Sequence, residues 1–293
     1  GVTSAELARV KAAAEAGLRR RLEGLTARAD MLNEYHHFYG EAASFERDLA
    51  RRLAPTTASL QAWARAVFGP GRLDLRILPE SVAPVAELDR RPADLAPRAY
   101  APPVANEGVL ASGVPLELIA RPGSGLFAGY LMVDGGERLV PMEKAGLAGL
   151  LATLLTKGAG ARDAAAFAEA VAAEGATLEA SASWRHLVVS VAGLSSRLDA
   201  TLDLFADAIL RPRLGAEDVE RERELQLSAI RARAEDPQAV ARTSARVLLF
   251  GRDDPRGRPA EGWLEAVAGI ERADLVSARA RLLSPSGARF VFV

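Results

Sequence analysis

The residues of this sequence that could bind a metal or act as a nucleophile are few. There are three histidines, His36, His37 and His186, and no cysteine, so disulfides, thiolate metal sites and thiol nucleophiles are excluded. His36 and His37 are neighbours, and neighbouring side chains on a helix point about 100° apart, so they are poorly placed to bind one ion. His186 lacks a serine in a Gly-x-Ser-x-Gly turn that it could activate. We interpret His36 and His37 as the polar end of a helix, and His186 as the start of a strand.

One predicted helix has flanks that suggest a metal-binding helix, but it contains no residue that would hold a metal. The segment from Glu143 to Thr156, EKAGLAGLLATLLT, is strongly apolar and is followed by Lys157 and Gly158. A helix that is apolar on all sides is normally buried, so we expect this one to pack against a sheet. Imidazoles, carboxylates and thiolates are the side chains that bind zinc, and the segment has none after its first residue.

Composition limits the classes of function. The chain has 293 residues, of which 49% are hydrophobic and 26% charged, and its net charge is −1. This length is enough for two domains of roughly 150 residues each, and the charge balance argues against a nucleic-acid-binding protein. No apolar run approaches the ~20 residues that a membrane-spanning helix needs. No leader is visible and both ends resemble cuts, so we expect the chain to be part of a longer polypeptide.

The pattern along the chain predicts an α+β fold in which an antiparallel or mixed sheet is flanked by helices. Residues 1–78 are helical in character, from a Thr3–Glu6 capping box onward, and end in a short strand. Residues 79–107 are rich in proline, which interrupts helices and central strands, so we expect an extended linker. Residues 108–293 alternate between strand and helix patterns and form the second block.

In the second block, each run of alternating or helically spaced apolar residues predicts one strand or helix. A Ser-Gly turn between two apolar runs predicts a hairpin, a serine is expected to cap the helix that ends at Pro212, and two helical segments are expected after the long charged helix. In chain order the expected elements are a hairpin at 108–122, a strand at 124–136, helices at 143–156 and 163–175, strands at 176–183 and 186–194, helices at 195–212 and 216–236, the two further helical segments, and a strand at 288–293.

Several phrases, in this order, resemble the insulinase/pitrilysin family of zinc metallopeptidases, peptidase family M16. The first block, residues 1–78, resembles the closing helices and last strand of one family domain. The second block, residues 108–293, resembles the N-terminal half of a second domain. The resemblance covers nearly the whole chain and rests on the joint order of its phrases. Those of the second block are GVPLELIARP, KAGLAGLLATLLTKGAG, GATLEASASWRHLVVSVAGL, ADAILRPRL, ERERELQLSAIRARAEDP and LFGRDDPRGRP.

In that family, the helix that matches residues 144–157 carries the inverted motif His-x-x-Glu-His. Two histidines four residues apart lie on one helix face and bind one zinc ion, while the glutamate activates zinc-bound water. A third ligand, a glutamate, comes from a later helix. The histidine positions fall here on Gly149 and Thr153, the catalytic glutamate on Ala152, and the distal glutamate on Ala229. All four positions are degenerate, and of the family's carboxylates only Glu222, an outer one, remains.

The resemblance implies a non-catalytic half of an M16 zinc metallopeptidase, with no catalytic residue, metal or cofactor in this segment. Zinc is expected in a catalytic M16 domain that pairs with it in cis or in trans, and the two halves would enclose a peptide or unfolded protein substrate in a chamber. An inactive M16-like scaffold or assembly subunit is the alternative, and a hydrolase with an unrecognised site is a third possibility. A bacterial cytoplasm or periplasm stays open as the location.

Overall fold

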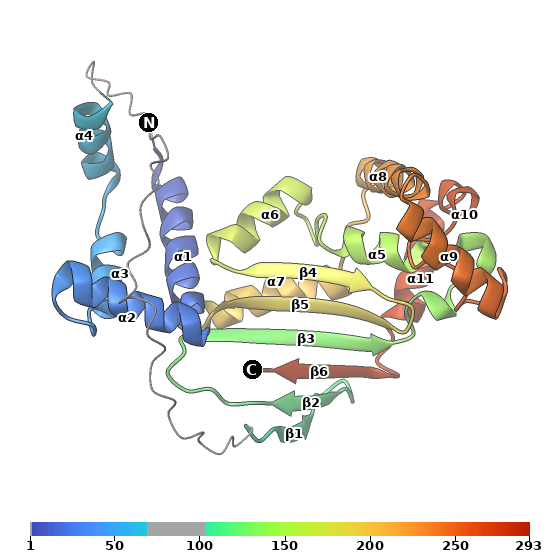
Figure 1. Cartoon of the computed structure of the whole chain (residues 1–293), viewed down its shortest axis with the longest axis horizontal. Helices are drawn as coiled ribbons and strands as arrows, with labels where there is room; N and C mark the ends of the chain where they lie inside the picture. The colour runs from blue at the N-terminus through green and yellow to red at the C-terminus, as the bar shows by residue number, and fades with distance from the viewer. Residues whose placement is uncertain (1, 69–102) are drawn as a thin grey trace, which may run out of the picture.

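The computed structural model describes residues 2–68 and 103–293. The short strand expected at the end of the first block, RLDLRILPE at 72–80, and most of the expected linker at 79–107 lie outside the described residues. The first block forms α1 (Ser4–Arg21), α2 (Leu25–Tyr39), α3 (Phe45–Leu53) and α4 (Thr57–Val67). The second block supplies a six-stranded sheet and the helices that lie between its third and its last strand in the chain (Figure 1).

The helices of the first block begin and end at capping residues. The Thr3 hydroxyl accepts from the Glu6 amide at 3.2 Å and the Glu6 carboxylate accepts from the Thr3 amide at 2.7 Å, so the predicted capping box of α1 is present. α2 ends at Gly40, whose φ of 72° is a left-handed conformation that favours glycine. A small core joins α1, α2 and α3, and its buried members are Leu18, Met31, Tyr35 and Leu49.

The sheet is mixed, with the strand order β1-β2-β6-β3-β5-β4. Among these strands only β2 and β6 are parallel neighbours, and all other neighbouring pairs are antiparallel. β1 and β2 form the predicted hairpin, with Gly113 at a φ of 84° in its turn. The strands are β1 (Asn106–Val109), β2 (Pro115–Leu118), β3 (Leu126–Asp134), β4 (Thr177–Ala182), β5 (His186–Leu194) and β6 (Ala288–Phe292).

Helices cover one face of this sheet and form the main core with it. Leu187, Val189 and Val191 alternate along β5, are at most 2% exposed, and pack in one cluster with Leu150 and Leu151 of α5. This packing confirms that the apolar helix is buried against the sheet. The helices of the second block are α5 (Leu147–Leu155), α6 (Ala164–Ala173), α7 (Leu198–Leu210), α8 (Ala216–Ala234), α9 (Pro237–Phe250), α10 (Leu264–Ala268) and α11 (Arg272–Leu282).

Three expectations about these helices are wrong. The helix expected from Glu143 begins as α5 only at Leu147, because Gly146 has a φ of 101° that interrupts helical geometry. No serine caps α7, which follows a short 3-10 turn at Ser195–Arg197 and has no capping side chain. Three helices follow α8 instead of two, because the five residues of α10 are too few to show a helical period.

α1 packs on the second block as well as on its own. Ala12 and Ala16 are 3% and 1% exposed, and α1 lies beside α6 (Figure 1). A Cβ on Gly175, in the turn after α6, would come within 2.8 Å of the Ala12 carbonyl oxygen, so this approach needs glycine. Arg20 Nη2 donates to the Gly175 carbonyl at 3.5 Å. Small side chains thus allow α1 to contact the α6 end of the second block closely.

Candidate functional site

The four degenerate positions lie on two helices that pack together, α5 and α8. Gly149, Ala152 and Thr153 are on α5, and Ala229 is on α8. Ala152 is 1% exposed and faces the core, whereas Thr153 and Ala229 are exposed. The Thr153 hydroxyl donates to the Gly149 carbonyl oxygen at 3.2 Å, one turn earlier in the same helix. The only polar side chain among the four is therefore engaged within its own helix.

A buried carboxylate fixes the beginning of α5. Glu137, at 1% exposure, accepts hydrogen bonds from the backbone amides of Gly146 at 2.6 Å and Ala148 at 3.2 Å. These amides belong to the first turn of the helix, where backbone donors have no partner within the helix and a negative charge is favourable. Gly146 has no room for a side chain, because a Cβ there would lie 2.5 Å from the Glu261 carbonyl oxygen.

Glu137 faces an equally buried arginine. Arg258, at 2% exposure, has its Nη2 3.7 Å from Glu137 Oε1 and donates to the carbonyl oxygens of Glu137 and Val140. Burial raises the pKa of Glu137 from 4.5 to about 7, while the two amides and Arg258 oppose this rise. The pair connects the turn after β3 to the segment after α9, so the entry to α5 depends on residues far apart in sequence.

Glu222, which the resemblance aligns with an outer carboxylate of the family, is paired with cations. Glu222 of α8 is 6% exposed, and its Oε1 lies 3.5 Å from Lys157 Nζ and 3.2 Å from Arg221 Nη2. Lys157 follows α5, so this ion pair joins the C-terminal end of α5 to α8. Because the Glu222 carboxylate already faces two cations, its geometry indicates a structural role in holding α5 and α8 together.

The segment 259–262 lies over the first histidine position. A Cβ at Gly149 would have the Ala260 carbonyl oxygen as its nearest neighbour, at 3.8 Å. Gln226 Nε2, on α8, donates to the carbonyl oxygens of Gly146 at 3.1 Å and Glu261 at 2.8 Å. One amide side chain therefore ties α8, the start of α5 and the covering segment together. The nearest group to the Gly149 side-chain position is therefore a backbone carbonyl oxygen and not a metal-binding side chain.

The side chains at these positions do not fit a zinc ion. A catalytic zinc site takes three protein ligands and water, with ligands drawn from histidine, carboxylates and cysteine. Gly149 and Ala229 have no donor atom in their side chains, and the Thr153 hydroxyl is a poor zinc ligand. Within residues 2–68 and 103–293, no three His, Asp or Glu side chains are grouped closely enough to hold a metal ion.

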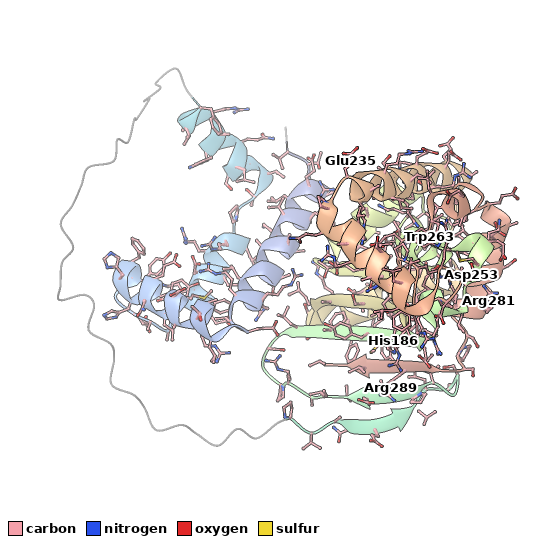
Figure 2. The ribbon with its side chains drawn as sticks, turned by 45° about the vertical axis from the view of Figure 1, so that its right-hand side comes forward. His186, Glu235, Asp253, Trp263, Arg281 and Arg289 are labelled. Atoms are coloured by element: carbon pink, nitrogen blue, oxygen red, sulfur yellow. The ribbon has the colours of Figure 1, made fainter. Side chains whose placement is uncertain are left out.

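The three histidines lie on other elements than these positions. His36 and His37 are exposed at the C-terminal end of α2. His186 begins β5, with its Nε2 3.8 Å from Asp134 Oδ1 on β3. Figure 2 shows His186 at the sheet and Trp263 among the helices that cover the sheet.

In the described part of the chain, no helix has the length and apolarity needed to cross a membrane.

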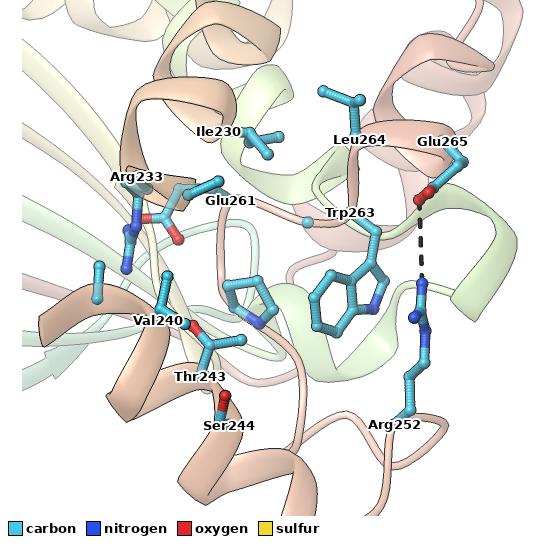
Figure 3. Close-up of a pocket in the computed structure, with 14 residues that line it drawn as sticks. Ile230, Arg233, Val240, Thr243, Ser244, Arg252, Glu261, Trp263, Leu264 and Glu265 are labelled. Carbon is cyan, nitrogen blue, oxygen red and sulfur yellow. Dashed lines mark hydrogen bonds and ion pairs between the residues drawn. The ribbon is translucent and has the colours of Figure 1, made fainter. Parts of the chain in front are cut away.

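A cavity of about 340 Å³ lies beside the covering segment, between α8, α9 and residues 259–265 (Figure 3). Arg252 stacks on the Trp263 ring with its guanidinium carbon 4.7 Å from the ring centroid, and its Nη2 lies 3.9 Å from Glu265 Oε2. At the other end, Arg233 forms an ion pair with Glu261. The apolar part of the lining is formed by Ile230, Ala239, Val240, Pro259, Trp263 and Leu264.

Sequence reasoning missed the Glu137–Arg258 pair and this cavity. Glu137 lies in the turn GGERL, where nothing in the local pattern distinguishes a buried carboxylate from an exposed one. Trp263 gave a weak signal, because a large aromatic side chain usually packs against other residues. Arg258 lies 121 residues from Glu137, and Trp263 stacks with Arg252 from the loop after α9, so neither pairing was readable from spacing.

Comparison with known sequences identifies the second block. Residues 127–248 match the sequence model of the family described as insulinase (peptidase family M16). An uncharacterized zinc protease of Mycobacterium leprae is 36% identical over 141 residues, which is 48% of this chain and 32% of that protein. An uncharacterized zinc protease of Mycobacterium tuberculosis is 37% identical over the same length and covers the same shares. The chain thus spans about a third of the length of these curated relatives.

Solved structures agree on the fold. The peptidase M16 inactive domain from Pseudomonas fluorescens superposes with a TM-score of 0.61 and 21% identity, covering 65% of this chain and 46% of that one. Pitrilysin gives a TM-score of 0.56 and 21% identity, covering 65% of this chain and 21% of that one. At these identities the likeness establishes the α+β architecture. Residues 127–248 are thus an M16-type segment by sequence, and the second block has the α+β fold of these structures.

Proposed function

We propose that this chain is a zinc-less half of an M16-type peptidase that pairs with a zinc-bearing M16 domain and lines a peptide-enclosing chamber. The observation that supports this proposal is the preserved pairing of α5 with α8 around positions that lack every metal ligand. Gly149 is covered by the Ala260 carbonyl, and Glu222 is paired with Lys157. Because α5 and α8 pack together without any metal-binding side chain at these positions, we infer that the pair has a structural role in this half of the enzyme.

The zinc and the catalytic glutamate of the complete enzyme would belong to the partner domain, in the same polypeptide or in a separate chain. Peptide hydrolysis would then need both halves, because the zinc-bearing half supplies the chemistry and this half supplies part of the enclosure. An excluded-water chamber strengthens electrostatic interactions inside it and limits access to unfolded or short substrates. The M16 inactive domain from Pseudomonas fluorescens is a precedent, by its description, for a domain of this fold without activity.

Reconstitution tests the proposal. The purified chain is mixed with the M16 domain that carries His-x-x-Glu-His in the same polypeptide or the neighbouring gene. Association is measured by analytical ultracentrifugation and hydrolysis by cleavage of a quenched fluorescent peptide. We expect a complex, with zinc-dependent hydrolysis by the complex and none by this chain alone. Zinc-dependent hydrolysis by this chain alone, or no complex at any concentration tested, would contradict the proposal.

The alternative is an inactive M16-like scaffold that supports a protein complex, and the loss of all four positions fits it equally. The same experiment separates the two functions. A complex that forms with an M16 partner but hydrolyses no peptide, with zinc present in the partner, favours the scaffold. Hydrolysis that appears only in the mixture favours the peptidase half.

A further inference from the structure

Two hollows meet at α9 and together form one groove. The first is the apolar cavity of about 340 Å³ described above, and the second, of about 390 Å³, is lined on α9 by Arg242, Thr243 and Arg246. Both hollows are lined by Arg233, Thr243, Pro259 and Glu261, so they are continuous. We propose that this groove, named here the α9 groove, binds a peptide segment in which an apolar side chain is followed closely by carboxylates.

The apolar half of the α9 groove suits an aliphatic or aromatic side chain. Its volume is at the lower end of the range for small-ligand pockets, which are lined mostly by apolar groups. Val240 is 44% exposed on the wall of the cavity, and Trp263 contributes an aromatic surface. Large aromatic and aliphatic anchors in such pockets dominate the energy of peptide recognition. An apolar side chain that entered would remove Val240 and Leu264 from water.

The basic half of the groove contains two arginines without an ion-pair partner among the described residues. Arg242 and Arg246 are four residues apart on α9, on one face of the helix, and both are exposed. Like charges at this spacing destabilise a helix slightly. Among the described residues, neither arginine has an ion-pair partner, whereas Arg233 is paired with Glu261. Arginine prefers carboxylates in forked geometry, so the charge of this half complements an acidic peptide.

The position of the groove connects it with the proposed function. The wall formed by residues 259–262 also covers the degenerate position Gly149, since the Ala260 carbonyl lies 3.8 Å from where its Cβ would be. The groove is therefore adjacent to the place where an active domain holds its zinc. The inference rests on the proposed function in this one respect, that the peptide is the substrate enclosed between the halves. It adds the chemical class of segment that this half holds.

Fluorescence anisotropy with the whole chain tests the inference. Three labelled nonapeptides are compared, one with Phe followed closely by two Glu, one with Lys in place of both Glu, and one with Ala in place of Phe. We expect the first to bind about tenfold more tightly than either of the others, since one charge-assisted hydrogen bond or one filled apolar pocket is worth about that factor. Equal binding of all three, or no binding of any at millimolar peptide, would overturn the inference.

A pair of variants locates the effect. Arg242→Gln with Arg246→Gln should abolish the preference for Glu over Lys and keep the preference for Phe over Ala. Arg185→Gln with Arg281→Gln is the matched control, because it removes the same charge from exposed arginines outside the groove. Circular dichroism confirms folding of both. A loss of preference in the control as well would place the peptide elsewhere and refute the groove.

The outcome is separable from that of the reconstitution experiment. Association with the zinc-bearing domain is measured without peptide, and peptide binding is measured without that domain. If the halves associate and the peptides do not bind, the inference about the α9 groove fails alone. If the peptides bind with the expected preferences and the halves never associate, the proposed pairing fails alone.

Discussion

Stability of the second block should fall as pH rises through the titration of Glu137. Burial raises the pKa of this carboxyl from 4.5 to about 7, so between these values the folded chain holds a proton that the unfolded chain has released. Stability falls with pH wherever the folded state binds more protons than the unfolded state. Each pKa unit corresponds to about 1.4 kcal/mol, which gives a loss of about 3 kcal/mol for this group between pH 4.5 and pH 7.

Urea denaturation followed by circular dichroism from pH 4.5 to 8 measures this loss. Other groups titrate over the same range, so the comparison is with Glu137→Gln, which keeps the shape of the side chain and cannot ionise. Its difference in unfolding free energy from the wild type should change by about 3 kcal/mol across the range, in favour of the variant as pH rises. Glu143→Gln, at an exposed position nearby, is the control and should follow the wild type. Parallel profiles for wild type and Glu137→Gln would refute the reasoning.

Two further predictions concern the first block and its contact with the second. Gly175→Ala should destabilise the chain by about 1–3 kcal/mol in urea denaturation, since its Cβ would meet the Ala12 carbonyl at 2.8 Å at a φ of 64°. Gly123→Ala, with a φ of 85° and no neighbour within 4 Å, is the control for backbone strain alone, and an equal loss there would contradict the close contact. Asp48, whose pKa is held down at about 2 by hydrogen bonds from Arg51 and Arg52 against desolvation, should stabilise the first block above pH 3.8 and lose that effect as pH falls toward 2. Asp48→Asn should remove this acid-dependent loss in thermal unfolding, and an unchanged acid profile would show that the contact contributes nothing.

Periodicity and capping signals were sufficient for most of the fold. Thr3 with Glu6 located the start of α1 and Gly40 the end of α2, because both act on the backbone within a few residues. Alternation along β5 located its buried face for the same reason. The start of α5 was placed too early, because Gly146 takes a left-handed conformation only in combination with Glu137 and the segment 259–262. Of these two contacts, the one with residues 259–262 is distant in the sequence.

The candidate site divides in the same way. Gly149 and Thr153 on α5 could be named from the sequence through the family resemblance, in which they align with two histidines, and the loss of the zinc site there stays a prediction. The ion pair between Lys157 and Glu222 and the α9 groove were not accessible, because they depend on how α8 and α9 lie against α5. Packing geometry decides whether a charged residue is paired, exposed or free to bind a ligand.

Zinc analysis of the purified chain tests the central claim most directly. After exposure to zinc and exhaustive dialysis, the metal content is measured by inductively coupled plasma mass spectrometry. The triple variant Gly149→His, Thr153→His and Ala229→Glu is analysed beside it, and we expect it to retain zinc, because three ligands are the protein's share of a catalytic zinc site. The wild-type chain should retain no stoichiometric zinc. One tightly held zinc ion per wild-type chain would contradict the claim that this half has lost its metal site.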